Sequence, residues 1–351
     1  MTAEVYPLSK SALTTIDLPG FEPARMIRLI KECIDRCQLD LSGRVVMTEA
    51  ASGAYAVTPI AAALAGAGEV IAVTRTTTYG SAYDIEQNTR RLAEMAGVPS
   101  DVISVFKKKD PGLLSRADVV TNSGHLRPLD AAAIACLKTG AVVPLMFEAW
   151  EIQAGRCDLD LDALALRGIA VAGTNERHPN IDVFSYLGTM AIKLLLDAGI
   201  PPLKATVALL CDNPFSDYIR SGLTSVGATV SCGAELSSFH EQDAPDVLLL
   251  AQRPNWKSIL SESEARWLSK NWPNTIIAQF WGDIDREALA NHGLHYWPQT
   301  GPSPGHMAVL PSAVGPDPII RLQIGGLKVA EVLLKPAEER TRQDREYLDE
   351  L

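Results

Sequence analysis

The chain has 351 residues, of which 47% are hydrophobic and 21% charged, and its formal net charge is −10. This length is too great for one ordinary core and predicts a packed protein of two domains. The acidic balance, with one short basic cluster at Lys107-Lys-Lys109, argues against a nucleic-acid partner. No run of about 18 apolar residues appears, and Met1 is not followed by the basic-then-apolar order of a secretion signal. We therefore expect no membrane partner and a cytoplasmic location.

Six cysteines are scattered along the chain, at positions 33, 37, 136, 157, 211 and 232. Most of them lie in apolar patterns, which is typical of small buried hydrophobes in a reducing compartment. Cys33 and Cys37 would share one face of a helix, but no second Cys or His pair has the spacing of metal ligands. No metal site is expected.

The first half of the chain alternates strand and helix patterns. A helical period over 22–38 predicts a leading helix, and β-branched runs then predict a series of six strands. The expected strands are 44–49, 69–74, 102–106, 117–122, 141–147 and 168–173, with helices near 55–66, 82–96 and 128–138.

The second half repeats this pattern after a connecting helix. The apolar helix from Val183 to Ala198 is long enough to cross from one domain to the next, and Gly199-Ile-Pro-Pro202 stops it. Strands are then expected at 205–211, 228–232, 246–251, 275–280 and 295–298, with helices near 215–226, 262–271 and 285–292. The run 316–334 predicts a closing helix that could fold back onto the first domain, and the charged tail 338–350 predicts a solvated helix or a frayed end.

Both halves are typical of parallel sheets with helices on their faces, so the expected fold class is α/β with two Rossmann-like domains and an interdomain cleft. The expected organisation is a first domain over 1–182, a crossing helix and hinge over 183–202, a second domain over 203–315, and a closing helix with its tail over 316–351. Open parallel sheets bind ligands beyond the carboxyl ends of their strands. The residues directly after each strand are therefore the candidates for a site.

The residues after the first two strands suit a nucleotide. Ser52 and Gly53 would turn the chain into a helix N-terminus able to hold an anion, although no GxGxxG pattern is present. Arg75 and Thr76 follow the second strand, where an NAD site usually has Asp or Glu, so a dinucleotide bound here would be NADP rather than NAD. The alternative is that Arg75 simply caps a loop.

The densest polar cluster follows the fourth strand. Asn122, His125 and Arg127 place an amide, a titratable imidazole and a fixed cation close together in sequence. Asn122 is a candidate cofactor contact, Arg127 would hold a carboxylate or phosphate, and His125 would move a proton. A helix-capping loop whose histidine bonds to the backbone is the alternative.

Further candidates follow the later strands. Glu148 follows the fifth strand as a possible catalytic carboxylate, and Asn175 and Glu176 follow the sixth, with Asn175 as a cofactor contact. In the second half Asp212 is a cofactor candidate, although the glycines that let a pyrophosphate approach are missing there. His306, in a loop rich in proline and glycine, is a candidate acid or base, and a structural histidine is the competing interpretation.

The order of segments resembles that of the D-2-hydroxyacid dehydrogenase family. The run from Ala133 to Val143 and the run from Arg167 to Thr174 look like the end of that family's substrate domain, and the helix from Val183 looks like its crossing helix. Gly282-Asp-Ile-Asp-Arg-Glu-Ala-Leu289 is similar to its Gly-x-Ile-Asp-x-x-Ala-Leu segment, and His306 falls roughly where its acid/base histidine follows.

This resemblance implies a two-domain Rossmann-like architecture and hydride transfer with a nicotinamide cofactor. The chain departs from the family at three places. Asp212-Asn-Pro-Phe215 stands where the family has its glycine fingerprint, and Trp281 stands where a carboxylate-binding Arg precedes the glycine. No Glu partner for the histidine is evident between His295 and His306.

We therefore expect an NAD(P)-dependent oxidoreductase that acts on a small anionic substrate in the interdomain cleft, with NADP or NAD as its cofactor. One alternative is a non-redox lyase, isomerase or transferase on the same scaffold, and a methyltransferase is a weaker version of it. Another is a noncatalytic sensor that binds a metabolite by closing the hinge at 179–202. The apolar closing and crossing helices permit a homodimer, which is the expected assembly.

Overall fold

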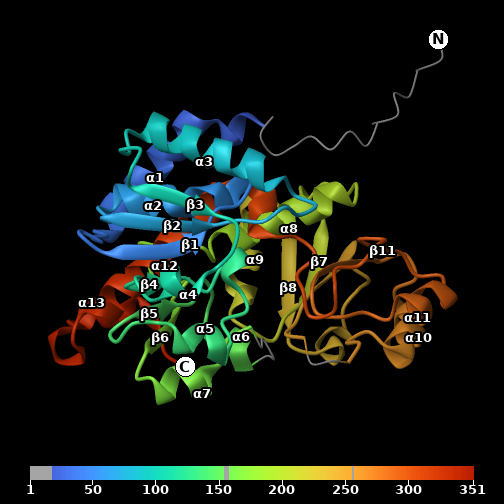
Figure 1. The fold of residues 1–351 in the computed structure, drawn as a ribbon. Helices are drawn as coiled ribbons and strands as arrows, with labels where there is room; N and C mark the ends of the chain where they lie inside the picture. The colour runs from blue at the N-terminus through green and yellow to red at the C-terminus, as the bar shows by residue number, and fades with distance from the viewer. Residues whose placement is uncertain (1–17, 154–157, 255–256) are drawn as a thin grey trace, which may run out of the picture. The chain divides into compact units, whose positions relative to one another are not determined.

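The computed structural model describes residues 18–153, 158–254 and 257–351 (Figure 1). Residues 1–17, where no secretion signal is expected, and Cys157 lie outside the described residues. The chain forms two compact units that are each discontinuous in sequence. The first unit comprises Met1–Met146, Asp158–Thr174 and Gly315–Leu348, and the second unit comprises Phe147–Cys157, Asn175–Val314 and Asp349–Leu351. Residues 175–182, expected in the first domain, thus belong to the second unit.

The first unit is built on a seven-stranded sheet in the order β12-β6-β5-β4-β1-β2-β3. Strands β1 to β6 pair in parallel, and β1 and β2 are almost wholly buried, as expected for Val- and Ile-rich strands covered on both faces. The six predicted strands are all present, although β4 and β5 are shorter than predicted. The strands are β1 (Val45–Glu49), β2 (Glu69–Val73), β3 (Ile103–Phe106), β4 (Val119–Val120), β5 (Val142–Pro144), β6 (Ala170–Thr174) and β12 (Leu348–Asp349).

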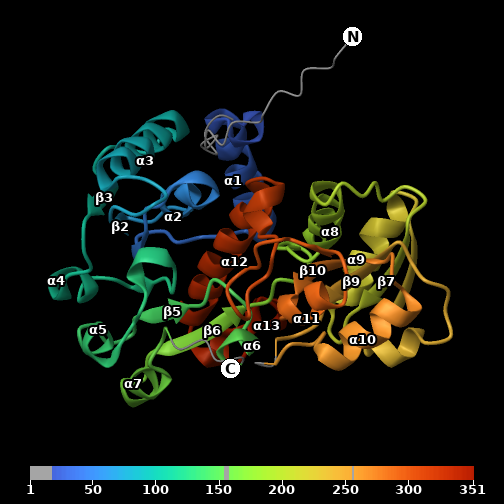
Figure 2. The same ribbon diagram turned by 90° about the vertical axis from the view of Figure 1, so that its right-hand side faces the viewer.

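The helices of the first unit cover this sheet. The leading helix begins where the Glu22 carboxylate accepts the backbone N–H of Arg25 at 2.8 Å, and it buries the face of Met26, Ile30 and Ile34. The closing helix α12 packs on β5, β6 and the leading helix, and Figure 2 shows it beside α1. The helices are α1 (Pro23–Cys37), α2 (Thr58–Leu64), α3 (Ala82–Ala96), α4 (Pro111–Leu114), α5 (Ala131–Ala135), α7 (Leu161–Leu166), α12 (Asp317–Leu334) and α13 (Arg342–Glu346).

The tail contains a largely exposed helix, which was one of the two predicted alternatives, but it is not a frayed end. The tail forms α13 and then β12, which joins the edge of the first sheet beside β6. Tyr347 and Asp344 are buried, at 6% and 8% exposed. Their burial is possible because the charges are paired: Lys335 donates to Asp344 at 2.8 Å, and the Lys328 ammonium lies 5.6 Å from the Tyr347 ring centroid.

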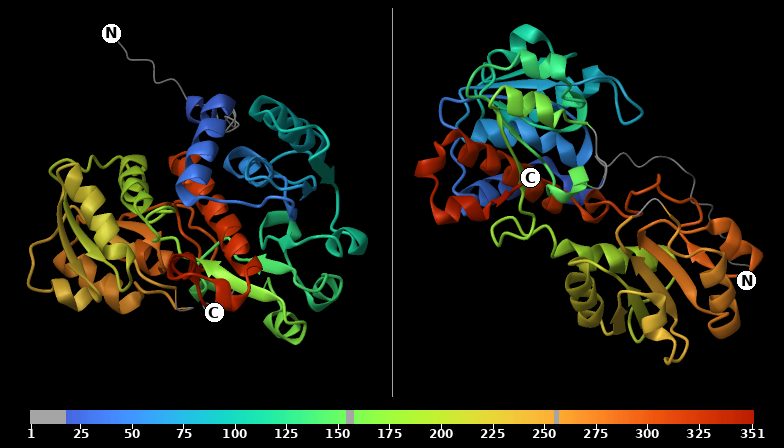
Figure 3. Two further views of the ribbon diagram at one scale, coloured as in Figure 1. Left: turned by 90° about the vertical axis from the view of Figure 1, so that its left-hand side faces the viewer. Right: turned by 90° about the horizontal axis from the view of Figure 1, so that it is seen from below.

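The second unit has a five-stranded parallel sheet in the order β11-β10-β9-β7-β8. Along β7, Val207 and Leu209 belong to one core cluster while Ala208 and Leu210 belong to another, because alternate side chains face the two layers of helices. Figure 3 shows these helices on both faces of the sheet. The elements are α6 (Trp150–Gln153), α8 (Tyr186–Asp197), β7 (Thr206–Leu210), α9 (Phe215–Ser225), β8 (Thr229–Gly233), β9 (Val247–Ala251), α10 (Glu262–Asn271), β10 (Ile276–Trp281), α11 (Arg286–Asn291) and β11 (Tyr296–Trp297).

The predicted crossing helix is present as α8, but it does not cross between domains. It belongs wholly to the second unit, where it packs against α9. The two helices approach closely at Gly188 and Gly222: a Cβ built on Gly222 would lie 2.4 Å from the Gly188 Cα. Two glycines facing each other thus decide where α8 packs. Within the described residues, no helix is both long and apolar enough to cross a bilayer.

Candidate functional site

The residues predicted after β4 come together in the first unit through a partner that the sequence did not indicate. Asn122 is fully buried, and its Nδ2 donates to Asp158 Oδ1 at 3.2 Å. Arg127 Nη1 donates to the other oxygen of Asp158 at 3.1 Å. Asp158 therefore fixes both side chains, while Asn122 Oδ1 has no hydrogen-bond partner within the part of the chain that the structure describes.

A second carboxylate missed by sequence reasoning lies against this group. Glu49 ends β1 and is 5% exposed, and a Cβ built on Gly124 would lie 1.5 Å from its Oε2. Only glycine leaves room for the carboxylate there. Burial raises the pKa of Glu49 to about 7, although the Arg127 charge and the His125 backbone N–H each favour the ionised form. We call Glu49, Asn122, His125, Arg127 and Asp158 the polar cluster.

Arg75 lies close enough to act on His125. Burial lowers the pKa of His125, and the Arg75 charge lowers it further, so the imidazole is neutral at neutral pH. Arg75 and Thr76 are exposed in the loop after β2, where Thr76 Oγ1 accepts the backbone N–H of Ala82 at 3.1 Å. Thr76 thus stabilises the loop, and Arg75 contributes a positive charge near the polar cluster.

The turn after β1 differs from the predicted anion-binding helix N-terminus. Gly53 has φ +61° and opens a short 3₁₀ helix, Gly53–Val57, so that α2 begins only at Thr58. The Ser52 side chain makes no capping hydrogen bond. The expected turn is present, but the helix does not start at Ser52 and Gly53.

The polar cluster lies at the topological switch point of the first sheet. The strand order β3-β2-β1-β4-β5-β6 reverses direction between β1 and β4, and open parallel sheets bind ligands at the carboxyl ends of the two strands beside such a reversal. Glu49 ends β1, and His125 follows β4. Their proximity follows from the pairing of β1 with β4, in which Met47 lies opposite Val120.

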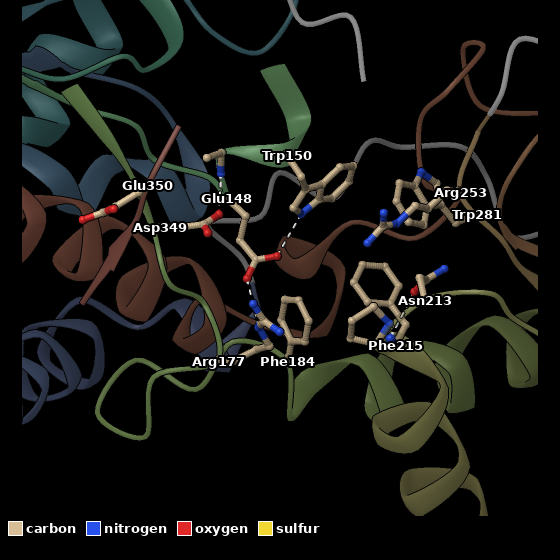
Figure 4. A pocket seen from close by; sticks show the side chains of 12 residues that line it. Glu148, Trp150, Arg177, Phe184, Asn213, Phe215, Arg253, Trp281, Asp349 and Glu350 are labelled. Atoms are coloured by element: carbon tan, nitrogen blue, oxygen red, sulfur yellow. Dashed lines mark hydrogen bonds and ion pairs between the residues drawn. The ribbon is translucent and has the colours of Figure 1, made fainter. Parts of the chain in front are cut away.

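The second unit contains a cavity of about 230 Å³ that we call the aromatic pocket (Figure 4). It also lies at a switch point, because the order β8-β7-β9-β10-β11 reverses between β7 and β9. The Asn213 loop follows β7, Arg253 follows β9, and Trp281 ends β10. Its lining consists of Glu148, Ala149, Trp150, Arg177, Phe184, Asn213, Pro214, Phe215, Arg253, Trp281, Asp349 and Glu350.

Four aromatic rings form one continuous wall of this pocket. Trp281 stacks on Phe215 with ring centroids 5.1 Å apart, and Trp150 meets Trp281 edge-on at 5.2 Å. Phe184 meets Phe215 edge-on, also at 5.2 Å. Stacked and edge-on pairs at these separations are attractive and hold the rings in place.

Carboxyl groups form the polar side of the aromatic pocket, and Glu148 is the buried one among those that line it. Glu148 is 4% exposed, its Oε2 accepts the Trp150 indole N–H at 2.8 Å, and its Oε1 lies 3.3 Å from the Arg177 guanidinium. Burial raises the pKa of Glu148. Next to it, burial and the charges of Glu148, Glu151 and Asp349 raise the pKa of Glu176 well above its usual range. Carboxyl groups with raised pKa values of this kind are typical of acid/base sites.

The other predicted residues of the second unit stabilise loops in this structure. Asp212 Oδ1 accepts from Asn213 Nδ2 at 3.0 Å and from the backbone N–H of Arg253 at 3.0 Å. Asn175 Oδ1 accepts the backbone N–H of Arg177 at 3.2 Å. His306 is exposed in its loop and does not line the aromatic pocket.

The predicted site residues thus fall into two groups. His125 and Arg127 lie in the polar cluster of the first unit, with Arg75 nearby, while Glu148 and His306 belong to the second unit. The aromatic wall was missed because its members lie in four separate segments of the chain. Among residues 18–153, 158–254 and 257–351, no group of three or more His, Cys, Asp or Glu side chains could hold a metal ion.

Comparisons with known proteins bear on the fold. No family model matches the chain, and no curated protein matches it in sequence. The solved structure of a dipicolinate synthase polypeptide from Bacillus halodurans matches with a TM-score of 0.54 and 12% identity, over 85% of this chain and 100% of that one. A dipicolinate synthase polypeptide from Bacillus subtilis matches with a TM-score of 0.53 and 14% identity, over 84% of this chain and 97% of that one. The chain shares the fold of these proteins.

A weaker match is a cofactor (NAD+)-bound 3-phosphoglycerate dehydrogenase from Entamoeba histolytica. Its TM-score is 0.41 at 12% identity, over 79% of this chain and 99% of that one, and a TM-score of this size does not establish a common fold. The Rossmann-like α/β class expected from the sequence is confirmed. Membership of the D-2-hydroxyacid dehydrogenase family stays a prediction.

Proposed function

We propose that the chain is an NAD(P)-dependent oxidoreductase that acts on a small anionic metabolite and binds its dinucleotide at the carboxyl edge of the first-unit sheet. One observation carries the proposal: the strand order β3-β2-β1-β4-β5-β6, with Arg75 exposed directly after β2. In sheets of this order the dinucleotide lies across the switch point, and the residue about 20 positions after the first turn contacts the ribose 2′ position.

The residues at this edge fit such a ligand. Arg75 has no carboxylate partner among the described residues, so its guanidinium is available to the 2′-phosphate that distinguishes NADP from NAD. Asn122 Oδ1 is a buried acceptor without a donor, which a ribose hydroxyl or a nicotinamide amide would satisfy. Gly53, with φ +61°, is the one glycine in the turn after β1 that allows a close backbone approach.

The polar cluster supplies acid/base chemistry and charge. When bound, the nicotinamide ring would accept or donate the hydride. His125, neutral because of burial and the Arg75 charge, would take up or return the proton at the hydroxyl oxygen of the substrate. Arg127, held by Asp158, would bind the anionic group of the substrate. The two dipicolinate synthases above are named for dipicolinate, itself a small dianion, which agrees with this substrate class.

The test is a titration of the purified chain with NADPH and NADH, followed by nicotinamide fluorescence. We expect NADPH to bind more tightly, and Arg75→Ala to remove this preference by weakening NADPH about 10- to 100-fold, which is the loss of a charge-assisted phosphate contact of about 1.5–3 kcal/mol. Arg90→Ala is the matched control, because Arg90 is an exposed arginine on α3 that pairs with Glu86. Binding of neither dinucleotide would refute the proposal.

The aromatic pocket favours a second candidate, a non-redox lyase, isomerase or transferase that uses protonated carboxyl groups. Burial raises the pKa of Glu148 and, together with neighbouring negative charges, that of Glu176, so these two carboxyl groups are the candidates for a general acid. Turnover without any nicotinamide cofactor, lost in Glu148→Gln, would support this candidate over the first.

A further inference from the structure

The aromatic wall of the second unit has no free hydrogen-bond donors of its own. The Trp150 indole N–H donates to Glu148 Oε2 at 2.8 Å, and the Trp281 indole N–H donates to the Gly305 carbonyl at 3.1 Å. Both rings therefore present only their faces and edges to an occupant. A wall of this kind selects a flat, apolar body by contact area and not by hydrogen bonds.

Asn213 is also occupied by the protein itself. Its Nδ2 donates to the Ala251 carbonyl at 2.8 Å and to Asp212 at 3.0 Å, and its Oδ1 accepts the Phe215 backbone N–H at 3.0 Å. This side chain shapes the loop after β7. Polar recognition in the aromatic pocket must therefore come from the charged residues.

One charged residue of the pocket is a cation without a counter-ion. The Arg253 guanidinium lies 5.7 Å from the Trp150 ring centroid, and no carboxylate of the described residues pairs with it. Arg177, the other cation in the lining, already lies 3.3 Å from Glu148 Oε1 and over the Phe184 ring. Arg253 is thus the group that can pair with a carboxylate brought by a ligand.

The opposite end of the aromatic pocket has an excess of negative charge. Figure 4 shows Asp349 and Glu350 on the far side of the rings from Arg253, with Glu148 between them and Trp150. Asp349 accepts the Ala149 backbone N–H at 2.6 Å, Arg177 pairs with Glu148, and no cation of the described residues pairs with Asp349 or Glu350. A positive group on a ligand would reduce their mutual repulsion.

We propose that the aromatic pocket binds a small zwitterion with a flat apolar middle, whose carboxylate pairs with Arg253 and whose protonated amine lies against Asp349 and Glu350. The cavity of about 230 Å³ is of a size for one ring with two short substituents. The proposal rests on none of the residues assigned above to the dinucleotide edge of the first unit.

The proposal is tested by calorimetric titration of the full chain with three probes: 4-(aminomethyl)benzoate, benzoate and benzylamine. The first carries both charges, and the others carry one each. We expect the zwitterion to bind at least about tenfold more tightly than either singly charged probe, and to quench tryptophan fluorescence because Trp150 and Trp281 line the cavity.

Variants that remove one charge each test which end of the aromatic pocket binds the carboxylate and which binds the amine. Arg253→Gln should weaken the zwitterion and benzoate about tenfold and leave benzylamine unchanged, whereas Asp349→Asn should weaken the zwitterion and benzylamine and leave benzoate unchanged. Asp349→Asn could also disturb the hydrogen bond that Asp349 accepts from the Ala149 backbone N–H. Glu350→Gln is therefore tested as a second variant of the acidic end, because it breaks no hydrogen bond within the described segments. Arg220→Gln is the matched control, since Arg220 is exposed on α9 and pairs with Asp217.

Three results would overturn the proposal. The first is no measurable binding of the zwitterion to the folded chain. The second is benzoate or benzylamine binding as tightly as the zwitterion. The third is wild-type affinity for the probe at either end of the pocket. This means an Arg253→Gln variant that binds benzoate as tightly as the wild type, or Asp349→Asn and Glu350→Gln variants that both bind benzylamine as tightly as the wild type. None of these results depends on whether the chain binds NADPH.

Discussion

Glu49→Gln tests the electrostatics of the polar cluster through stability. The pKa of Glu49 rises from 4.5 to about 7 on folding, mainly because burial disfavours the charged form. A raised folded-state pKa of an acid makes stability fall as pH rises between these two values, since the unfolded chain has already lost its proton while the folded chain keeps it. At one pKa unit per 1.36 kcal/mol, the wild type loses about 3 kcal/mol between pH 4.5 and pH 7 from this group alone.

Glutamine has the shape of the protonated acid and no charge. The variant should match the wild type in stability near pH 4.5 and should exceed it by up to about 3 kcal/mol at pH 8. Urea denaturation followed by circular dichroism at several pH values measures the difference, and Glu94→Gln, an exposed change on α3, should alter stability little at any pH. A difference that is the same at pH 5 and pH 8, or a variant less stable than the wild type at pH 8, would refute the reasoning.

Three further changes test the packing. Gly124→Ala puts a Cβ 1.5 Å from Glu49 Oε2 at a residue with φ +33°, so thermal unfolding should show a loss of about 1–3 kcal/mol, partly recovered in the double variant with Glu49→Ala. Gly222→Ala forces α8 and α9 apart because its Cβ would lie 2.4 Å from the Gly188 Cα. Urea denaturation should show a similar loss in the free energy of unfolding, and an unchanged midpoint would contradict this close approach. Tyr347→Ala removes a buried ring and should cost about 3–5 kcal/mol by the same measurement, whereas a solvated tail would show almost no loss.

The polar cluster shows how far sequence reasoning could go at a site. Asn122, His125 and Arg127 were recognisable because they are neighbours in sequence after a predicted strand. Asp158, which holds two of them, is 31 residues beyond Arg127, and no local pattern connects it to them. Glu49 was visible only as the end of a strand, and its role follows from the pairing of β1 with β4.

The sequence by itself determined which segments form strands and helices, because β-branched runs, helical periods and turn residues act over a few neighbouring positions. The charged tail shows the limit of this local reasoning. Its composition predicted exposure to solvent, yet Lys335 pairs with Asp344 and the Tyr347 side chain is buried. Only the tertiary structure decided the order of strands, and with it the two switch points at which the candidate sites lie. The physical reason is that a site built from strand ends depends on which strands pair, and pairing is a contact between residues far apart in the chain.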